Sequence, residues 1–270
     1  MSERYFGEVS APDGTNLFYQ VDGEKGRPWL VLSNSLATDV RLWEAQLASL
    51  TKSHRVLRYD IRGHGKSGAA SAPYNLNMLV GDLIALFDAL EIERADFVGI
   101  SLGGMTGMEM AITHPGRINR LVCCDARSDA PDAYKAIWDG NIARLDEGGL
   151  GAVCEPTLER WFTAGFLQDP ANLDVLAMVR SMILETTRDG YVGVARCLQG
   201  LDILPRLGGI KCPTLYVVGE FDLAASVAVM EDMKDRTSGA EILILKSAAH
   251  LSNLEQPHAF AAGVQAFLKA

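Results

Sequence analysis

The stretch Gly99-Ile100-Ser101-Leu102-Gly103 decides the fold, because it joins a predicted strand over residues 96–100 to a predicted helix over residues 103–113. A serine between glycines at such a junction is typical of a sharp turn that presents a nucleophile above a sheet. The glycines avoid clashes in a strained backbone, and Gly104 lets the helix pack closely on the strand. Free N–H groups at the start of the helix suit a developing oxyanion. Ser101 is therefore the candidate nucleophile.

Short apolar runs alternate with longer helical patterns on both sides of this turn, which is typical of a parallel sheet joined by crossover helices. Asp13-Gly14 lies between two further apolar runs and predicts an antiparallel hairpin at the start of the sheet. We predict strands at residues 5–9, 16–21, 29–33, 55–59, 96–100, 118–124, 214–218 and 241–245. We predict helices at residues 40–50, 77–90, 103–113, 226–237 and 257–269. The expected fold class is α/β, a mostly parallel sheet with helices on both faces.

Strand signals stop between residues 126 and 200, where several helical patterns are broken by proline and by Gly148-Gly149. The segment shows neither repeats nor low complexity, so it is interpreted as an insertion and not as a linker. We expect an α/β core formed by residues 1–125 and 201–270. Residues 126–200 are expected to form a helical cap over it.

The chain has 270 residues, of which 48% are hydrophobic, and a net charge of −9, as in an ordinary globular protein. This charge, without a basic cluster, argues against nucleic acid or an anionic membrane surface as a partner. Residues 67–81 form the longest run free of Asp, Glu, Lys and Arg, and a membrane span needs about 20 apolar residues. Because the first residues contain no apolar signal segment, a cytoplasmic location is expected.

The cysteines give no sign of a metal site or of a disulfide framework, since none of them forms a CxxC pair. We interpret all five as structural residues: Cys123, Cys124, Cys154, Cys197 and Cys212.

A serine nucleophile needs a base, and His250 is the best placed of the five histidines. It follows the last predicted strand and precedes the last predicted helix, so it is expected at the carboxyl edge of the sheet. Ser252 and Glu255 have the spacing of a capping box, which would fix the exit of this loop into the helix. The remaining histidines are interpreted as structural or exposed: His54, His64, His114 and His258.

The imidazole needs an acid that fixes its tautomer, and two aspartates follow predicted strands. Asp222 gives the chain order Ser, Asp, His that is typical of this architecture. Asp125 follows the strand at residues 118–124, and neighbouring strands could present either carboxylate to the histidine. We favour Asp222 and keep Asp125 as the alternative.

An oxyanion hole needs two N–H donors, and the first is expected from Leu102, the residue after the nucleophile. The second should come from the loop after the strand at residues 29–33. In Ser33-Asn34-Ser35-Leu36-Ala37, small polar residues let the chain turn sharply, which leaves the Leu36 N–H as the candidate donor.

Taken together, these motifs resemble those of α/β-hydrolases of the 3-oxoadipate enol-lactonase group, and the resemblance covers nearly the whole chain. Its most selective element is Ser33-Asn34-Ser35-Leu36. Further matching stretches are Val56-Leu57-Arg58-Tyr59-Asp60, Arg62-Gly63-His64-Gly65, Asp222-Leu223-Ala224-Ala225, His250-Leu251-Ser252-Asn253, Trp138 and Arg160-Trp161-Phe162-Thr163. The resemblance implies hydrolysis of 3-oxoadipate enol-lactone to 3-oxoadipate in aromatic-compound breakdown, through an acyl-enzyme on Ser101. It implies neither a metal nor an organic cofactor.

The sequence also departs from that group. Asp125-Ala126-Arg127-Ser128-Asp129 stands where an Asn-Thr-Ala-Ala type sequence is usual, Ala37 replaces a glycine, and Ser226 and Val227 replace proline. The first change lies where the insertion leaves the core. Two alternatives therefore stay open: a carboxylesterase or lactonase with another small substrate, and a small-molecule receptor on a hydrolase fold. The oligomeric state stays undetermined.

For substrate binding, the cap offers two aromatic candidates, Trp138 and Trp161, and two cationic candidates, Arg127 and Arg160. Residues 126–200 carry a net charge of −4, so an anionic lactone would approach against a negative field and would need a local cation. If no arginine reaches the cavity, a neutral ester or lactone becomes the expected substrate.

Overall fold

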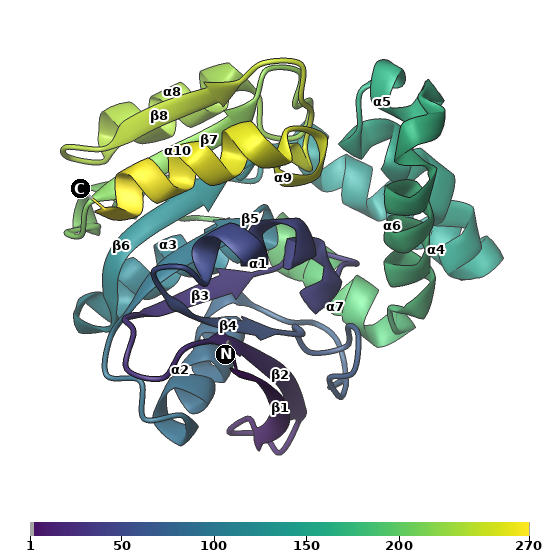
Figure 1. Cartoon of the computed structure of the whole chain (residues 1–270). Helices are drawn as coiled ribbons and strands as arrows, with labels where there is room; N and C mark the ends of the chain where they lie inside the picture. The colour runs from purple at the N-terminus through teal and green to yellow at the C-terminus, as the bar shows by residue number, and fades with distance from the viewer. Residues whose placement is uncertain (1–2, 270) are drawn as a thin grey trace.

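The computed structural model describes residues 3–269 and confirms the predicted α/β architecture (Figure 1). Its strands form one sheet in the order β1-β2-β4-β3-β5-β6-β7-β8. The first two form the expected antiparallel hairpin, β2 also runs antiparallel to β4, and all later neighbours are parallel. The strands are β1 (Glu3–Ser10), β2 (Asn16–Gly23), β3 (Trp29–Ser33), β4 (Arg55–Tyr59), β5 (Ala95–Ile100), β6 (Ile118–Cys124), β7 (Thr214–Gly219) and β8 (Glu241–Leu245).

Helices cover both faces of the sheet (Figure 1). On one face α1 (Glu44–Leu50) packs beside α10 (Pro257–Lys269), and on the other α2 (Leu76–Ala89) packs beside α3 (Leu102–Thr113). Strands β5 and β7 are buried along their whole length, because helices lie on both sides of them. The second face is completed by α8 (Val227–Arg236), which packs on β7 and β8.

From Asp132 onward the segment predicted as a cap is mainly helical, and it lies at one end of the sheet (Figure 1). Its helices are α4 (Asp132–Trp161), α5 (Ala164–Gln168), α6 (Leu173–Glu185) and α7 (Arg188–Gln199). The break expected at Gly148-Gly149 is a kink within α4, where Gly149 has φ of 67°. That conformation is costly for other residues, so glycine lets α4 bend and continue.

Core and cap touch backbone to backbone at two glycines. The Gly63 carbonyl accepts hydrogen bonds from the Thr187 N–H at 2.9 Å and from its hydroxyl at 3.0 Å. A Cβ on Gly190 would lie 2.3 Å from the Gly63 oxygen, and a Cβ on Gly63 would lie 2.3 Å from the Gly190 Cα. Neither position can accept a side chain unless α7 moves away from the core.

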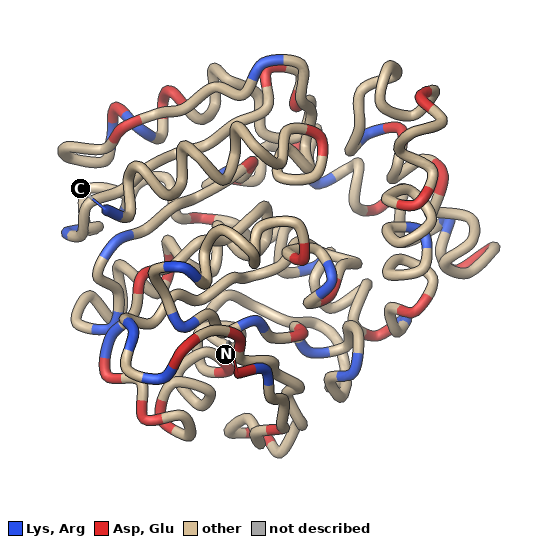
Figure 2. Tube along the Cα trace, viewed as in Figure 1, with Lys and Arg blue, Asp and Glu red and all other residues tan. Residues whose placement is uncertain are grey.

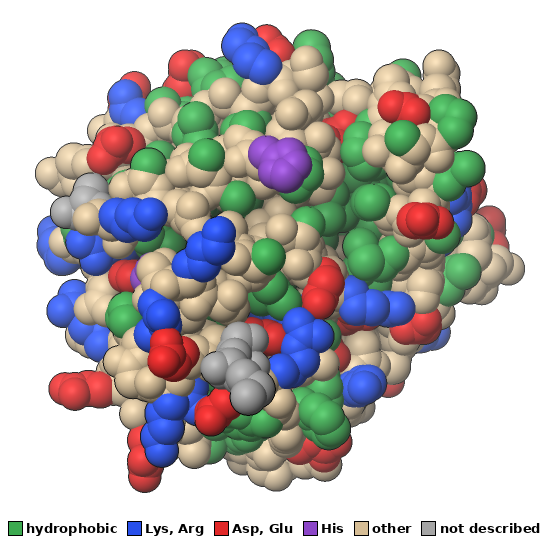
Figure 3. All heavy atoms as spheres, viewed as in Figure 1, with side chains coloured by type: hydrophobic (Ala, Val, Ile, Leu, Met, Phe, Trp, Pro, Cys, Tyr) green, Lys and Arg blue, Asp and Glu red, His purple; other side chains and the backbone are tan. Residues whose placement is uncertain are grey.

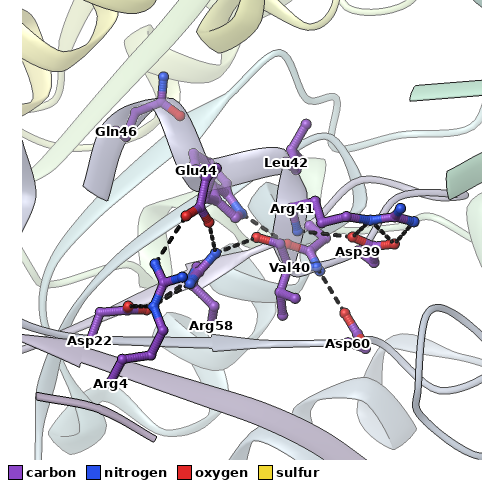
Figure 4. Close-up of polar contacts among 12 residues, drawn as sticks. Arg4, Asp22, Asp39, Val40, Arg41, Leu42, Glu44, Gln46, Arg58 and Asp60 are labelled. Carbon is purple, nitrogen blue, oxygen red and sulfur yellow. Dashed lines mark hydrogen bonds and ion pairs between the residues drawn. The ribbon is translucent and has the colours of Figure 1, made fainter. Parts of the chain in front are cut away.

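A buried arginine anchors the segment that follows β3 (Figure 4). The Arg58 side chain, only 1% exposed, donates to the Val40 carbonyl at 2.8 Å, to Asp22 at 2.7 Å and to Glu44 at 2.9 Å. The Asp60 carboxylate accepts from the Val40 N–H at 2.8 Å. These bonds fix the chain directly after the loop that carries Leu36, so that loop starts and ends on rigid backbone.

Charged positions of both signs are scattered along the chain (Figure 2). In the described part of the protein, no helix is long and apolar enough to cross a membrane. Among the same residues, no cluster of His, Cys, Asp and Glu has the arrangement of a metal site, and all five cysteines are free thiols.

Candidate active site

The candidate nucleophile lies in a strained turn between β5 and α3. Ser101 has φ of 53° and ψ of −115°, an unfavourable conformation that the surrounding packing maintains. A Cβ on Gly99 would lie 2.3 Å from the Gly103 carbonyl, and a Cβ on Gly103 would lie 2.2 Å from the Ser33 oxygen. Both flanking glycines are therefore needed for the turn to pass this close to its neighbours.

His250 and Asp222 are brought together by the loops that follow β8 and β7. The Asp222 Oδ2 lies 2.8 Å from the His250 Nδ1 in a buried contact. The other oxygen of Asp222 accepts from the N–H groups of Ala224 at 2.7 Å and Ala225 at 3.0 Å. With Nδ1 bonded in this way, the Nε2 of His250 is left for proton transfer.

The alternative acid, Asp125, forms no hydrogen bond with His250 in the described chain. Its Oδ1 accepts from the Gly219 N–H at 2.8 Å, and its Oδ2 contacts the Ser252 hydroxyl. The structure therefore brings Asp222, and not Asp125, to the imidazole.

The capping box expected from Ser252 and Glu255 is wrong. The Ser252 hydroxyl contacts Asp125, while the Glu255 carboxylate accepts from the Ala249 N–H and from the hydroxyl of Thr163 at 2.8 Å. A buried tertiary partner thus replaces the local partner in each case. The histidine loop is still held firmly, but by β6 and by the end of α4.

The two expected oxyanion donors come from the loop after β3 and from the residue that directly follows Ser101. Leu36 lines the same cavity as Ser101, and Leu102 is the first residue of α3. Within residues 3–269, no backbone or side-chain acceptor is found for either N–H group. Both N–H groups are thus free to bind an oxygen that becomes negatively charged.

A cavity of about 300 Å³ between the core and the cap contains Ser101 and His250. Both aromatic candidates line it, and the Trp161 ring stacks on the imidazole with ring centres 6.2 Å apart. On the face shown in Figure 3, hydrophobic side chains gather along the junction of core and cap. Several other residues line the cavity without any local sequence pattern that marks them as site residues: Met105, Tyr134, Ile137, Leu198 and Leu223.

Both arginine candidates also line the cavity, but only one is neutralised. Arg127 donates to the carboxylate of Asp129 at 2.8 Å and to its carbonyl at 2.8 Å. Arg160 forms no ion pair with any Asp or Glu of the described chain, and its guanidinium lies 5.3 Å from the centre of the Trp138 ring. Burial lowers the pKa of Arg160, although a guanidinium stays charged at neutral pH.

The other histidines lie outside the cavity. His54 is buried and contacts Asp96 at 3.2 Å, while His64 bonds the Arg62 carbonyl at 2.9 Å. Burial lowers the pKa of His64 to about 4, so it is neutral at physiological pH.

A serine in a strand–turn–helix junction, a histidine paired with a carboxylate and two N–H groups without an acceptor among the described residues define a hydrolase of the α/β-hydrolase fold. The comparison with known proteins agrees. Residues 28–257 match the family model for the alpha/beta hydrolase fold, and the chain belongs to that family.

Three relatives refine this assignment. The chain is 32% identical to 3-oxoadipate enol-lactonase 2 from Acinetobacter baylyi, over 98% of this chain and 97% of the relative. It is 38% identical to the enol-lactonase from Burkholderia xenovorans LB400, with a TM-score of 0.93 over 98% of this chain and all of that structure. It is 25% identical to a thermophilic esterase from Thermogutta terrifontis, solved with malate bound, with a TM-score of 0.89 and 98% of each chain covered. The predicted resemblance to the enol-lactonase group is thus confirmed.

Proposed function

We propose that this protein opens a small enol-lactone that carries a carboxylate, with 3-oxoadipate enol-lactone as the leading substrate. One observation carries the proposal: Arg160, which pairs with no Asp or Glu among residues 3–269, lines the cavity that contains Ser101 and His250. An unpaired, partly buried cation is costly, and a substrate carboxylate would neutralise it. The enol-lactonases among the relatives support the same reaction.

In the proposed mechanism, the Ser101 hydroxyl attacks the lactone carbonyl while His250 accepts its proton. Asp222 stabilises the imidazolium, and the N–H groups of Leu36 and Leu102 bind the oxyanion. Collapse of the tetrahedral intermediate breaks the ring C–O bond, and His250 returns the proton to the leaving enol oxygen. Water activated by the same histidine then releases the acid from Ser101.

Arg160→Ala is expected to raise KM for a carboxylate-bearing lactone by roughly 30-fold, the equivalent of about 2 kcal/mol for a lost charged hydrogen bond. The KM for a neutral aryl ester should change much less, because that substrate has no charge for the guanidinium to bind. Steady-state kinetics with both substrates measures the difference.

Arg188→Ala is the matched control, since this arginine also lies in the cap but its side chain is 60% exposed and pairs with Asp146. Arg127→Ala should have a smaller effect than Arg160→Ala, because Asp129 already neutralises Arg127. If KM were unchanged in both Arg127→Ala and Arg160→Ala, the proposal that the substrate carries a carboxylate would be wrong.

A substrate panel tests the reaction itself. It should contain 3-oxoadipate enol-lactone, saturated lactones and aryl esters, with loss of the enol absorbance as the readout for the first. Cleavage of aryl esters alone would indicate a carboxylesterase. The mainly apolar lining of the cavity is compatible with this alternative. Serine-directed labelling with one or few turnovers on every compound would instead indicate a receptor on a hydrolase fold.

A further inference from the structure

Asp125 is a buried carboxyl group that the proposed mechanism does not use. It follows β6, is fully buried and adopts φ of 47°, a left-handed conformation that aspartate adopts more readily than most other residues. Its N–H donates to the Val217 carbonyl of β7 at 2.8 Å. The chain thus turns sharply here against the neighbouring strand, and the turn directs the carboxyl group inward.

The two oxygens of Asp125 connect the two loops that carry the histidine and its acid partner. The Oδ1 accepts from the N–H of Gly219, the last residue of β7 and three positions before Asp222. The Oδ2 contacts the hydroxyl of Ser252, two positions after His250. One side chain of β6 therefore binds both loops close to the residues that must meet.

We propose that Asp125 is a positioning residue that locks the Asp222 loop to the His250 loop and so maintains the contact between these two side chains. The inference rests on the proposed serine chemistry but not on the identity of the lactone. A displacement of about 1 Å at such a pair costs roughly 100-fold in rate. Asp125 borders the cavity, but its carboxyl group is fully buried and bonded to the two loops, so we expect it to affect turnover by positioning them.

The surroundings of Asp125 shift the pKa of its carboxyl group. Burial raises its pKa well above the usual range, and the nearby Asp222 carboxylate raises it further. The other ionisable groups beside it are the thiols of Cys123 and Cys124, whose pKa values burial also raises. Both effects favour the uncharged form of the carboxyl group, whose oxygens accept from the Ser252 hydroxyl and from the Gly219 N–H.

An asparagine would keep both contacts, because its oxygen accepts from the Gly219 N–H and its N–H₂ group can donate to the Ser252 hydroxyl oxygen, so paired variants test the proposal. We expect Asp125→Ala to lower kcat about 10- to 100-fold with little change in KM, whereas Asp125→Asn stays within about fivefold of the parent. Asp132→Ala is the matched control, because this aspartate on α4 is fully exposed. The rate of labelling by a serine-directed fluorophosphonate should follow the same order. That readout separates the inference from the lactone, since it needs no substrate.

Two further measurements keep the test decisive if Asp125→Ala does not fold. Ser252→Ala should slow labelling about tenfold, whereas Asp125→Asn alone should stay close to the parent, because only the first change removes the contact between residues 125 and 252. The acid limb of the pH profile of labelling should coincide in Asp125→Asn and the parent. Labelling by Ser252→Ala at the parental rate would overturn the proposal. A lowered acid limb in Asp125→Asn would also overturn it, since Asp125 would then act on His250 through its charge.

Discussion

Ser101→Ala is expected to lower kcat by about 10⁵- to 10⁶-fold, as removal of the nucleophile does in other serine hydrolases. Without the hydroxyl no acyl-enzyme can form, and only the N–H groups of Leu36 and Leu102 remain to stabilise the oxyanion. The variant should fold normally, because alanine adds no atom to the turn. Turnover of the best substrate in the panel, together with thermal unfolding, measures both points.

Ser71→Ala is the control for this experiment, since Ser71 is exposed in the loop before α2. It should leave turnover and labelling unchanged. A Ser101→Ala protein that still turns over at more than about a hundredth of the parental rate would contradict the nucleophile assignment.

Asp222→Asn is expected to lower kcat by about 10⁴-fold while the fold is preserved. The amide is nearly isosteric, but its N–H₂ group would face the Nδ1 of His250 and favour the wrong tautomer. The imidazolium that forms during attack would also lose its counter-charge. Rates across the pH range, measured by release of a chromogenic alcohol, would show the loss at every pH.

Asp125→Asn is the control for the Asp222→Asn variant. Both aspartates are buried at strand ends, but only Asp222 contacts the imidazole, with the 2.8 Å bond described above. If Asp222→Asn kept near-normal turnover while Asp125→Asn lost it, the triad acid would have been assigned to the wrong strand.

The fold could be predicted from the sequence because its main signals are local. Strands β5 and β7 are covered on both faces, so they appear as continuous apolar runs, and their bounds agree with the expectation to within one residue. The prediction of one helix over residues 40–50 was less accurate. It begins as a 3₁₀ turn, Val40–Trp43, where the Asp39 carboxylate accepts from the Arg41 N–H.

Site residues could be predicted from the sequence only where they lie at the ends of strands or within recognisable motifs. Asp129 lies two residues after Arg127 and Glu159 lies directly before Arg160, so the sequence offers each arginine a nearby carboxylate. Only the structure shows that Arg127 forms an ion pair, while Arg160 pairs with no Asp or Glu of the described residues. The partners expected for Ser252 and Glu255 were wrong for a different reason. Both residues bond to groups that are distant in the sequence, namely Asp125 and Thr163.

The structure explains how the loop after β3 tolerates alanine at residue 37. It stands where the resemblance to the enol-lactonase group implies a glycine, and it has φ of 56° in the loop that carries Leu36. Alanine pays roughly 1–2 kcal/mol for this left-handed conformation. The ion network around Arg58 holds the chain just beyond this loop, so the loop keeps its shape without the glycine.

The contact between Gly63 and Gly190 limits how caps can be exchanged among relatives. A chimaera that joins this core to a foreign cap would need glycine on both sides of the seam, whatever residues line its cavity. Substrate preference can therefore be altered by point changes in α4 more readily than by replacing the cap as a module. A recombinant of two family members would therefore have to keep glycine at both positions, because the backbones of core and cap are in contact there.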